Sequence, residues 1–178
     1  YTTLFRSINA DEMNNDTVAL ASSLLGSHLF SGIYLYGQTL CTMSQKFSSF
    51  VQNAKEHNLK TEINVSAAKS SDDFMRILRT FHPDTVIQGD CMAKDKEILN
   101  FLGKNKISAV ITPNPVSAGK DNSINTKALY LRSFLDAGTD ARLGTESILL
   151  FNESISQFAS ELCNTGNFTK EEICSILA

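Results

Sequence analysis

The chain has 178 residues, 42% of them hydrophobic, and its 16 Lys and Arg against 19 Asp and Glu give a formal net charge of −3. A chain of this size can form one hydrophobic core. Because it has neither an excess of basic residues nor a stripe of Lys and Arg, we expect no nucleic-acid partner. No apolar run approaches the roughly 20 residues that cross a bilayer, and no signal peptide is evident. We expect one soluble domain with no membrane partner, in an unknown compartment, the cytoplasm being favoured.

Short β-branched or aromatic runs alternate with amphipathic stretches along the whole chain. Apolar residues at spacings of three and four, such as Phe74, Ile77, Leu78 and Phe81, predict helices between the runs. This rhythm is typical of repeated βα units and a parallel sheet. The six predicted strands are Thr3 to Ile8, Gly32 to Tyr36, Lys60 to Val65, Thr85 to Gln88, Ser108 to Ile111, and Ala141 to Thr145.

Further segments follow the last two strands. The stretch from Thr112 to Asn125 contains two prolines, a glycine and several polar residues, which predict a long loop at the carboxyl edge of the sheet, where ligands bind. A helix is expected from Ser154 to Leu162. Thr169, with Glu172 three residues on, predicts a capping box that opens a last helix.

The three histidines, His28, His57 and His82, each come just before a predicted strand. That position places them at the amino-terminal face, whereas reacting residues of parallel α/β proteins lie at the carboxyl-terminal face. We therefore expect no histidine-based metal site in this segment. Sequence patterns for nucleotide triphosphates, dinucleotides and serine hydrolases are also missing.

Mostly neutral polar residues follow the predicted strands. Asp90 and Glu146 are the carboxylates among them, and isolated carboxylates at strand ends are more often helix caps or loop partners than an acid/base pair.

Read in order, these strand ends resemble the adenosine deaminase family of metal-dependent hydrolases over nearly the whole chain. LFRSIN and GIYLYGQ look like the third and fourth barrel strands, the latter usually GxDLxGxE in that family. KTEINVSA stands where the family has HAGE, and VIQGD where it has GHG. ITPNPVS stands at the CPxSN turn, and ARLGTESILLF at the NTDDP strand end. The resemblance implies an α/β fold, an incomplete TIM-type barrel of parallel strands alternating with helices.

Carried over position by position, the resemblance implies that Gly37 and Gly89 let a substrate approach the backbone, and that Pro113 belongs to the turn after strand seven. The catalytic positions depart from the family. Asn64 stands where the family has a zinc-binding histidine, Ala67 where it has the proton-transferring glutamate, and Gln88 where it has the histidine that polarises the attacking water. Glu146 stands where the family has an aspartate that binds the metal, and Ser147 where it has an aspartate that contacts the purine.

Amides are weak metal ligands and a methyl group transfers no proton, so we expect a catalytically inactive protein without a cofactor that keeps the fold as a purine- or nucleoside-binding or regulatory module. One alternative is a divergent metal-dependent purine deaminase whose remaining zinc ligands lie on a missing amino-terminal segment, with Asp90, Cys91 or Glu146 as substitutes for the lost ones. Another is an unrelated open α/β sheet that binds a small ligand.

Residues 1–178 are predicted to form a single domain that lacks the first two βα units of the family's barrel. The chain begins at Tyr1 rather than at a methionine. We expect the missing strands to come from the same parent chain or from a second chain, because the outer predicted strands would otherwise expose open edges.

Overall fold

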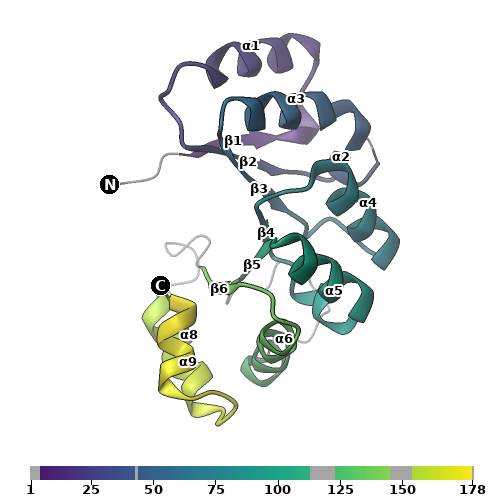
Figure 1. The fold of residues 1–178 in the computed structure, drawn as a ribbon. Helices are drawn as coiled ribbons and strands as arrows, with labels where there is room; N and C mark the ends of the chain where they lie inside the picture. The colour runs from purple at the N-terminus through teal and green to yellow at the C-terminus, as the bar shows by residue number, and fades with distance from the viewer. Residues whose placement is uncertain (1–4, 43, 113–122, 145–153, 178) are drawn as a thin grey trace. The chain divides into compact units, whose positions relative to one another are not determined.

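Parallel strands alternate with helices throughout residues 5–42, 44–112, 123–144 and 154–177, which are the residues that the computed structural model describes (Figure 1). The strands are β1 (Phe5–Asn9), β2 (Gly32–Tyr36), β3 (Lys60–Asn64), β4 (Thr85–Ile87), β5 (Ser108–Ile111) and β6 (Ala141–Leu143). The α-helices are α1 (Asn15–Leu25), α2 (Thr39–Thr42), α3 (Ser44–Glu56), α4 (Ser71–Phe81), α5 (Lys96–Asn105), α6 (Ile124–Asp136), α8 (Ile155–Asn164) and α9 (Lys170–Leu177). Two 3₁₀ turns are η1 (Ala10–Glu12) and η2 (Asp90–Lys94).

The strands follow one another in the order β1-β2-β3-β4-β5-β6, without a reversal. A doubly wound sheet reverses direction at one point, whereas a barrel places consecutive strands side by side. The predicted α/β fold is therefore confirmed, and the alternative of an open sheet with a switch point is wrong. The chain forms two compact units, Tyr1–Val86 and Ile87–Ala178. That residues 1–178 form a single domain stays a prediction.

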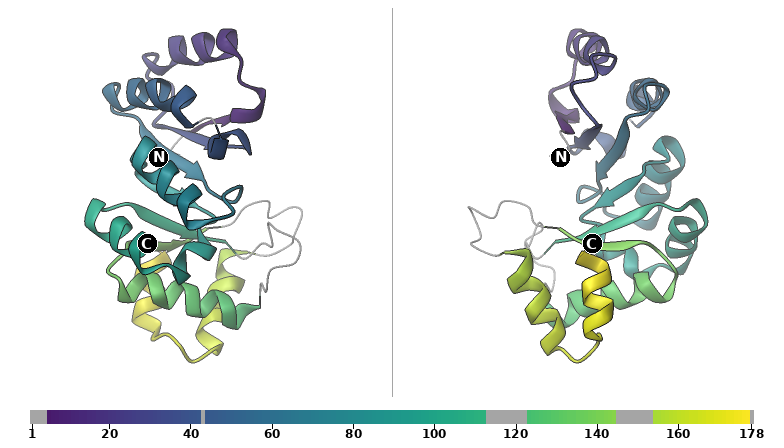
Figure 2. Two further views of the ribbon diagram at one scale, coloured as in Figure 1. Left: turned by 90° about the vertical axis from the view of Figure 1, so that its right-hand side faces the viewer. Right: turned by 60° about the vertical axis from the view of Figure 1, so that its left-hand side comes forward.

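In the first unit, the two faces of the sheet differ in chemistry. Helices α1, α3 and α4 lie on one face of the sheet (Figure 2). Ile33 and Leu35 of β2 are fully buried, as is Ile63 of β3, and we infer that they face these helices. Because side chains alternate along a strand, Tyr34 and Tyr36 project from the other face. The hydrophobic core of this unit thus lies between the sheet and its helices.

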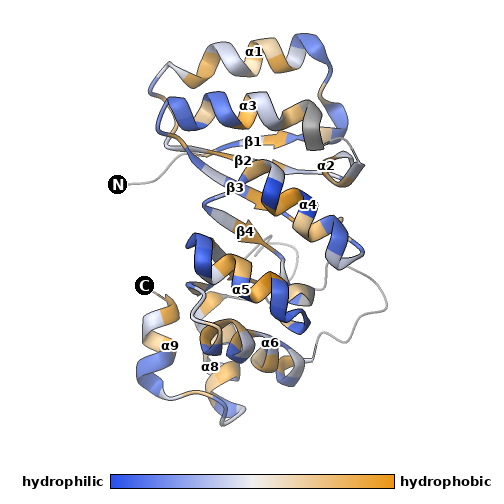
Figure 3. Ribbon diagram, turned by 45° about the vertical axis from the view of Figure 1, so that its right-hand side comes forward, coloured by the Kyte–Doolittle hydropathy of each residue, from blue (hydrophilic) through white to orange (hydrophobic). Residues whose placement is uncertain are grey.

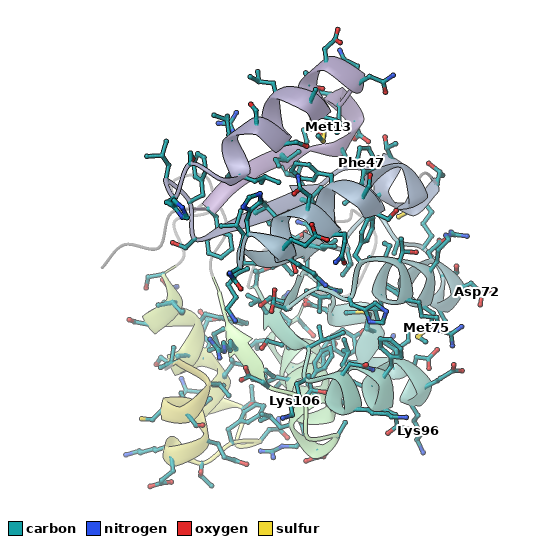
Figure 4. The ribbon with its side chains drawn as sticks, turned by 45° about the horizontal axis from the view of Figure 1, so that its top comes forward. Met13, Phe47, Asp72, Met75, Lys96 and Lys106 are labelled. Carbon is teal, nitrogen blue, oxygen red and sulfur yellow. The ribbon has the colours of Figure 1, made fainter. Side chains whose placement is uncertain are left out.

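Helix α4 shows how local sequence specifies these helices. The Ser70 side chain accepts a hydrogen bond from the Asp73 N–H at the helix start, an N-cap that satisfies an otherwise unpaired donor. Apolar and polar residues alternate along the helix (Figure 3), and its buried residues include Phe74, Leu78 and Phe81. Phe47 of α3 is likewise fully buried and is marked in Figure 4.

In the second unit, β5 and β6 pair in parallel, Ala109 beside Ala141. Buried residues of α6 and α8, among them Phe134 and Phe158, supply its core. The predicted capping box is confirmed, since the Glu172 N–H donates to Thr169 Oγ1 at 3.2 Å and the Thr169 N–H donates to Glu172 Oε2 at 2.9 Å.

Most predicted boundaries agree with the structure to within one or two residues. Strand β6, which was expected to extend to Thr145, ends at Leu143, and Thr145 itself lies outside the described residues. Helix α6 begins at Ile124, inside the segment predicted to be a loop up to Asn125. None of the helices in the described residues combines the length and apolar character of a membrane span.

Candidate functional site

The carboxyl ends of the first three strands place three side chains in one row. Asn9 of β1 lies opposite Tyr36 of β2, and the β2–β3 register, with Leu35 opposite Ile63, brings Asn64 next to Tyr36. In parallel α/β folds this edge of the sheet holds the functional residues. The row Asn9, Tyr36 and Asn64 is therefore the first part of the candidate site.

Asp11 joins the segments that follow β1 and β2. Its carboxylate accepts hydrogen bonds from the N–H groups of Gln38 at 3.0 Å and Thr39 at 2.7 Å, and from the Thr39 hydroxyl. The bonds from Thr39, with that from Gln38, hold the pKa of Asp11 below its ordinary value. Asp11 therefore stays ionised and fixes the turn after β2.

Gly37 allows this contact. Its φ of +124° lies in a region that L residues rarely adopt, and an added Cβ would lie 3.0 Å from Asp11 Oδ1 and from Asn9 Oδ1. The close approach to Asp11 thus accounts for a glycine at this position. Its predicted part in admitting a ligand to the backbone stays a prediction.

A cavity of about 300 Å³ opens beside this turn and is lined by residues that include Gln38, Cys41, Ala67, Lys69 and Asp73. Burial, and then the negative charge of Asp73, raise the pKa of the Cys41 thiol. Because the thiolate is the nucleophilic form, Cys41 is poorly suited to attack a substrate at neutral pH. Ala67 contributes only a methyl group to the wall of this cavity.

The Asn64 amide is engaged at both ends. Its Nδ2 donates to the Tyr34 hydroxyl at 2.9 Å, and its Oδ1 accepts from the Ser66 N–H at 2.9 Å. The side chain is 9% exposed. These bonds orient the amide toward the protein itself, so its oxygen serves as an acceptor within the turn after β3.

In the second unit, Gln88 and Gly89 follow β4. Gln88 is 8% exposed and has a φ of +59°, a left-handed conformation that is uncommon for an L residue, while its N–H donates to the Val110 carbonyl at 3.2 Å. Gly89 has a φ of −89°, which any residue can adopt. The backbone conformation therefore does not explain the glycine, and its ligand role stays a prediction.

Asp90 and Lys127 form an ion pair that the sequence did not suggest. Lys127 Nζ lies 2.8 Å from Asp90 Oδ2 and donates to the Thr112 carbonyl at 2.6 Å, and the lysine side chain is 3% exposed. The other oxygen, Asp90 Oδ1, is buried without a hydrogen-bond partner among the described residues. Lys127, on α6, thus ties this helix to Asp90 after β4 and to Thr112 at the end of β5.

Three predicted positions, Pro113, Glu146 and Ser147, lie outside the described residues. Within the described ranges, no group of three or more His, Cys, Asp and Glu side chains is placed to hold a metal ion. His28, His57 and His82 lie between a helix and the following strand, as predicted. The sequence did not indicate Asp11, Tyr34 or Lys127, because each forms its hydrogen bond with a residue 27 to 37 positions away in the chain.

No protein family model matches the chain. A Treponema pallidum protein described as an adenosine/adenine deaminase is 24% identical over 159 residues, which are 89% of this chain and 52% of that protein. The chain therefore spans about half the length of this relative.

Solved structures show the same fold. An amidohydrolase from Burkholderia ambifaria with bound zinc matches with a TM-score of 0.75 at 14% identity, over 98% of this chain and 50% of that one. An N6-methyl-AMP deaminase from Arabidopsis thaliana matches with a TM-score of 0.72 at 16% identity, over 98% and 51% of the two chains. The chain is thus similar in fold to half of a barrel of the amidohydrolase type.

Proposed function

We propose that this chain forms part of an adenosine/adenine deaminase-like barrel that binds a purine or nucleoside and does not deaminate it. The similarity to the Treponema pallidum protein and the consecutive order of the strands support the first half of the proposal. The chemistry at the strand ends supports the second half.

The observation that carries the proposal is the state of Asn64. The family resemblance puts a zinc-binding histidine at this position. Here an amide is present instead, its nitrogen bonded to Tyr34 and its oxygen to the Ser66 N–H. A neutral amide oxygen is a far weaker zinc ligand than imidazole, and this one already accepts a backbone hydrogen bond. The residues present at this strand end do not fit zinc.

Two other positions named by the resemblance agree with this interpretation. Ala67 stands where the resemblance places a proton-transferring glutamate, and the loss of a general acid/base typically lowers a rate by about 10²- to 10⁴-fold. Gln88 supplies a second buried amide where the resemblance places a histidine. Binding a purine needs neither that glutamate nor that histidine, whereas deamination by an activated water needs both.

The geometry also weighs against a divergent metal-dependent deaminase that uses Asp90 in place of a lost ligand. The Lys127 ammonium occupies one Asp90 oxygen at 2.8 Å, and a cation bound to the other oxygen would be repelled by that positive charge. Asp90 is therefore better suited to hold Lys127 than to hold a divalent metal.

The test compares metal content, turnover and binding in the native protein. We expect less than stoichiometric zinc, manganese or iron by elemental analysis, and no change in ultraviolet absorbance when adenosine, adenine or N6-methyl-AMP is added. Isothermal titration calorimetry with adenine or adenosine should still detect binding. An active adenosine deaminase assayed in parallel is the positive control. Stoichiometric metal together with turnover would contradict the proposal.

The outer edge of β1 is the surface at which further strands would complete the barrel. Among the described strands β1 pairs only with β2. Helix α1, which follows β1, has one buried residue, Leu25, and leaves Leu20 64% exposed. An open strand edge beside an apolar helix is typical of a surface that another βα unit covers.

We expect size-exclusion chromatography and mass spectrometry of the native material to find these 178 residues within a longer chain or a complex. A monodisperse, soluble monomer of only these residues would contradict the expectation.

A further inference from the structure

Tyr36 presents an exposed aromatic ring at the carboxyl end of β2. The residue is 37% exposed, although Ile33 and Leu35 of the same strand are fully buried. Because side chains alternate along a strand, the Tyr36 ring lies with Tyr34 on the face of the sheet that the helices do not cover. The Tyr36 ring is therefore accessible at the strand end, in the row that it forms with the amides of Asn9 and Asn64.

One face of this ring is already covered. The rings of Tyr34 and Tyr36 are stacked, with their centroids 5.6 Å apart and their planes inclined by 23°. Tyr34 comes earlier in the strand, so the second face of Tyr36 is turned toward the carboxyl edge. Tyr34 is itself held by the hydrogen bond from Asn64 at 2.9 Å, which fixes the stack in place.

An amide flanks the ring on the neighbouring strand. Asn9 lies opposite Tyr36; its Oδ1 accepts from the Asp11 N–H at 3.1 Å and its Nδ2 donates to Glu12 at 2.8 Å. A primary amide has two N–H groups and two acceptor lone pairs. These contacts use one of each, so Asn9 can donate to and accept from the edge of a ring stacked on Tyr36.

We propose that Tyr36 is the stacking platform of the site and that Asn9 bonds the edge of the bound ring, so the ligand is a planar nitrogen heterocycle of the purine type. This inference rests on the proposed function and deepens it by naming the groups that recognise the ligand. A flat ring with donors and acceptors at its edge matches both groups, whereas a sugar alone offers no π face.

The experiment is isothermal titration calorimetry of adenine into the native protein and three variants. Tyr36→Leu should weaken binding by roughly ten-fold or more, because base–aromatic stacking is typically lost with the ring. Tyr36→Phe keeps the ring and should bind within about two-fold of the wild type. Tyr130→Leu is the matched control, since that ring lies 5.5 Å from Lys94 Nζ in the second unit, and it should leave affinity unchanged.

The outcomes separate this inference from the proposed function. If the wild type binds adenine and Tyr36→Leu binds equally well, the platform is refuted while the proposed function stands. If the wild type binds neither adenine nor adenosine, both are refuted. D-ribose that binds as tightly as adenine would also overturn the platform. Tyr36 is exposed, so circular dichroism and urea unfolding should show that each variant is folded.

Discussion

Replacing Lys127 with methionine should lower the free energy of unfolding by about 3 kcal/mol, because it leaves the partly buried Asp90 carboxylate, whose Oδ1 has no hydrogen-bond partner among the described residues, without its counter-charge. The lysine side chain is 3% exposed and that of Asp90 is 21% exposed, so water cannot fully replace the ammonium. The Thr112 carbonyl would lose its donor as well. Urea unfolding followed by circular dichroism measures the effect.

Two further variants identify the cause. Lys106→Met removes an exposed lysine at the end of α5 (Figure 4) and should change stability by no more than about 0.5 kcal/mol. The double variant Asp90→Asn/Lys127→Met should recover most of the loss, since it leaves neither charge without a counter-charge. A double variant as unstable as Lys127→Met would show that the charge on Asp90 is not the cause.

Gly37→Ala should lower the free energy of unfolding by about 2–4 kcal/mol, through backbone strain and contact with Asp11 together. The residue has a φ of +124°, and the new Cβ would lie 3.0 Å from the Asp11 and Asn9 side chains. Neither neighbour can withdraw without breaking its own hydrogen bonds. Thermal and urea unfolding both report the loss.

Gly138→Ala is the matched control for backbone strain. Gly138 also has a positive φ, +72°, but an added Cβ there meets nothing within 4 Å. It should cost about 1 kcal/mol, the usual difference between glycine and alanine at such a position. If both alanine variants lose the same stability, the contact with Asp11 contributes nothing measurable.

The fold was predictable to a large extent because its signals are local. The alternation of strands and amphipathic helices predicted six strands, of which the last five start at the expected residues, while the expected start of the first strand, Thr3, lies outside the described residues. The capping box at Thr169 and Glu172 was read correctly for the same reason, since both partners lie within one helical turn. The family resemblance added the order of strands that a barrel requires.

The site was less predictable because its contacts join distant positions. Nothing near Lys127 distinguishes it from a solvent-exposed lysine of an amphipathic helix, yet its partner is 37 residues away. The contact of Gly37 with Asp11, which comes from the preceding βα unit, could not be read from the sequence, and the expected role of Gly37 in admitting a ligand stays a prediction. Tyr34 could not be linked to Asn64 until the register of β2 and β3 was known.

The Asp11 carboxylate has a consequence for molecular recognition. By fastening the backbone of Gln38 and Thr39, it orders the rim beside Tyr36 before any ligand arrives. A rim that is already ordered loses little conformational entropy when a ligand binds. A larger part of the interaction energy of each contact then contributes to the binding free energy. In hydrogen–deuterium exchange, these two amides should resist deuteration to the same degree with and without adenine.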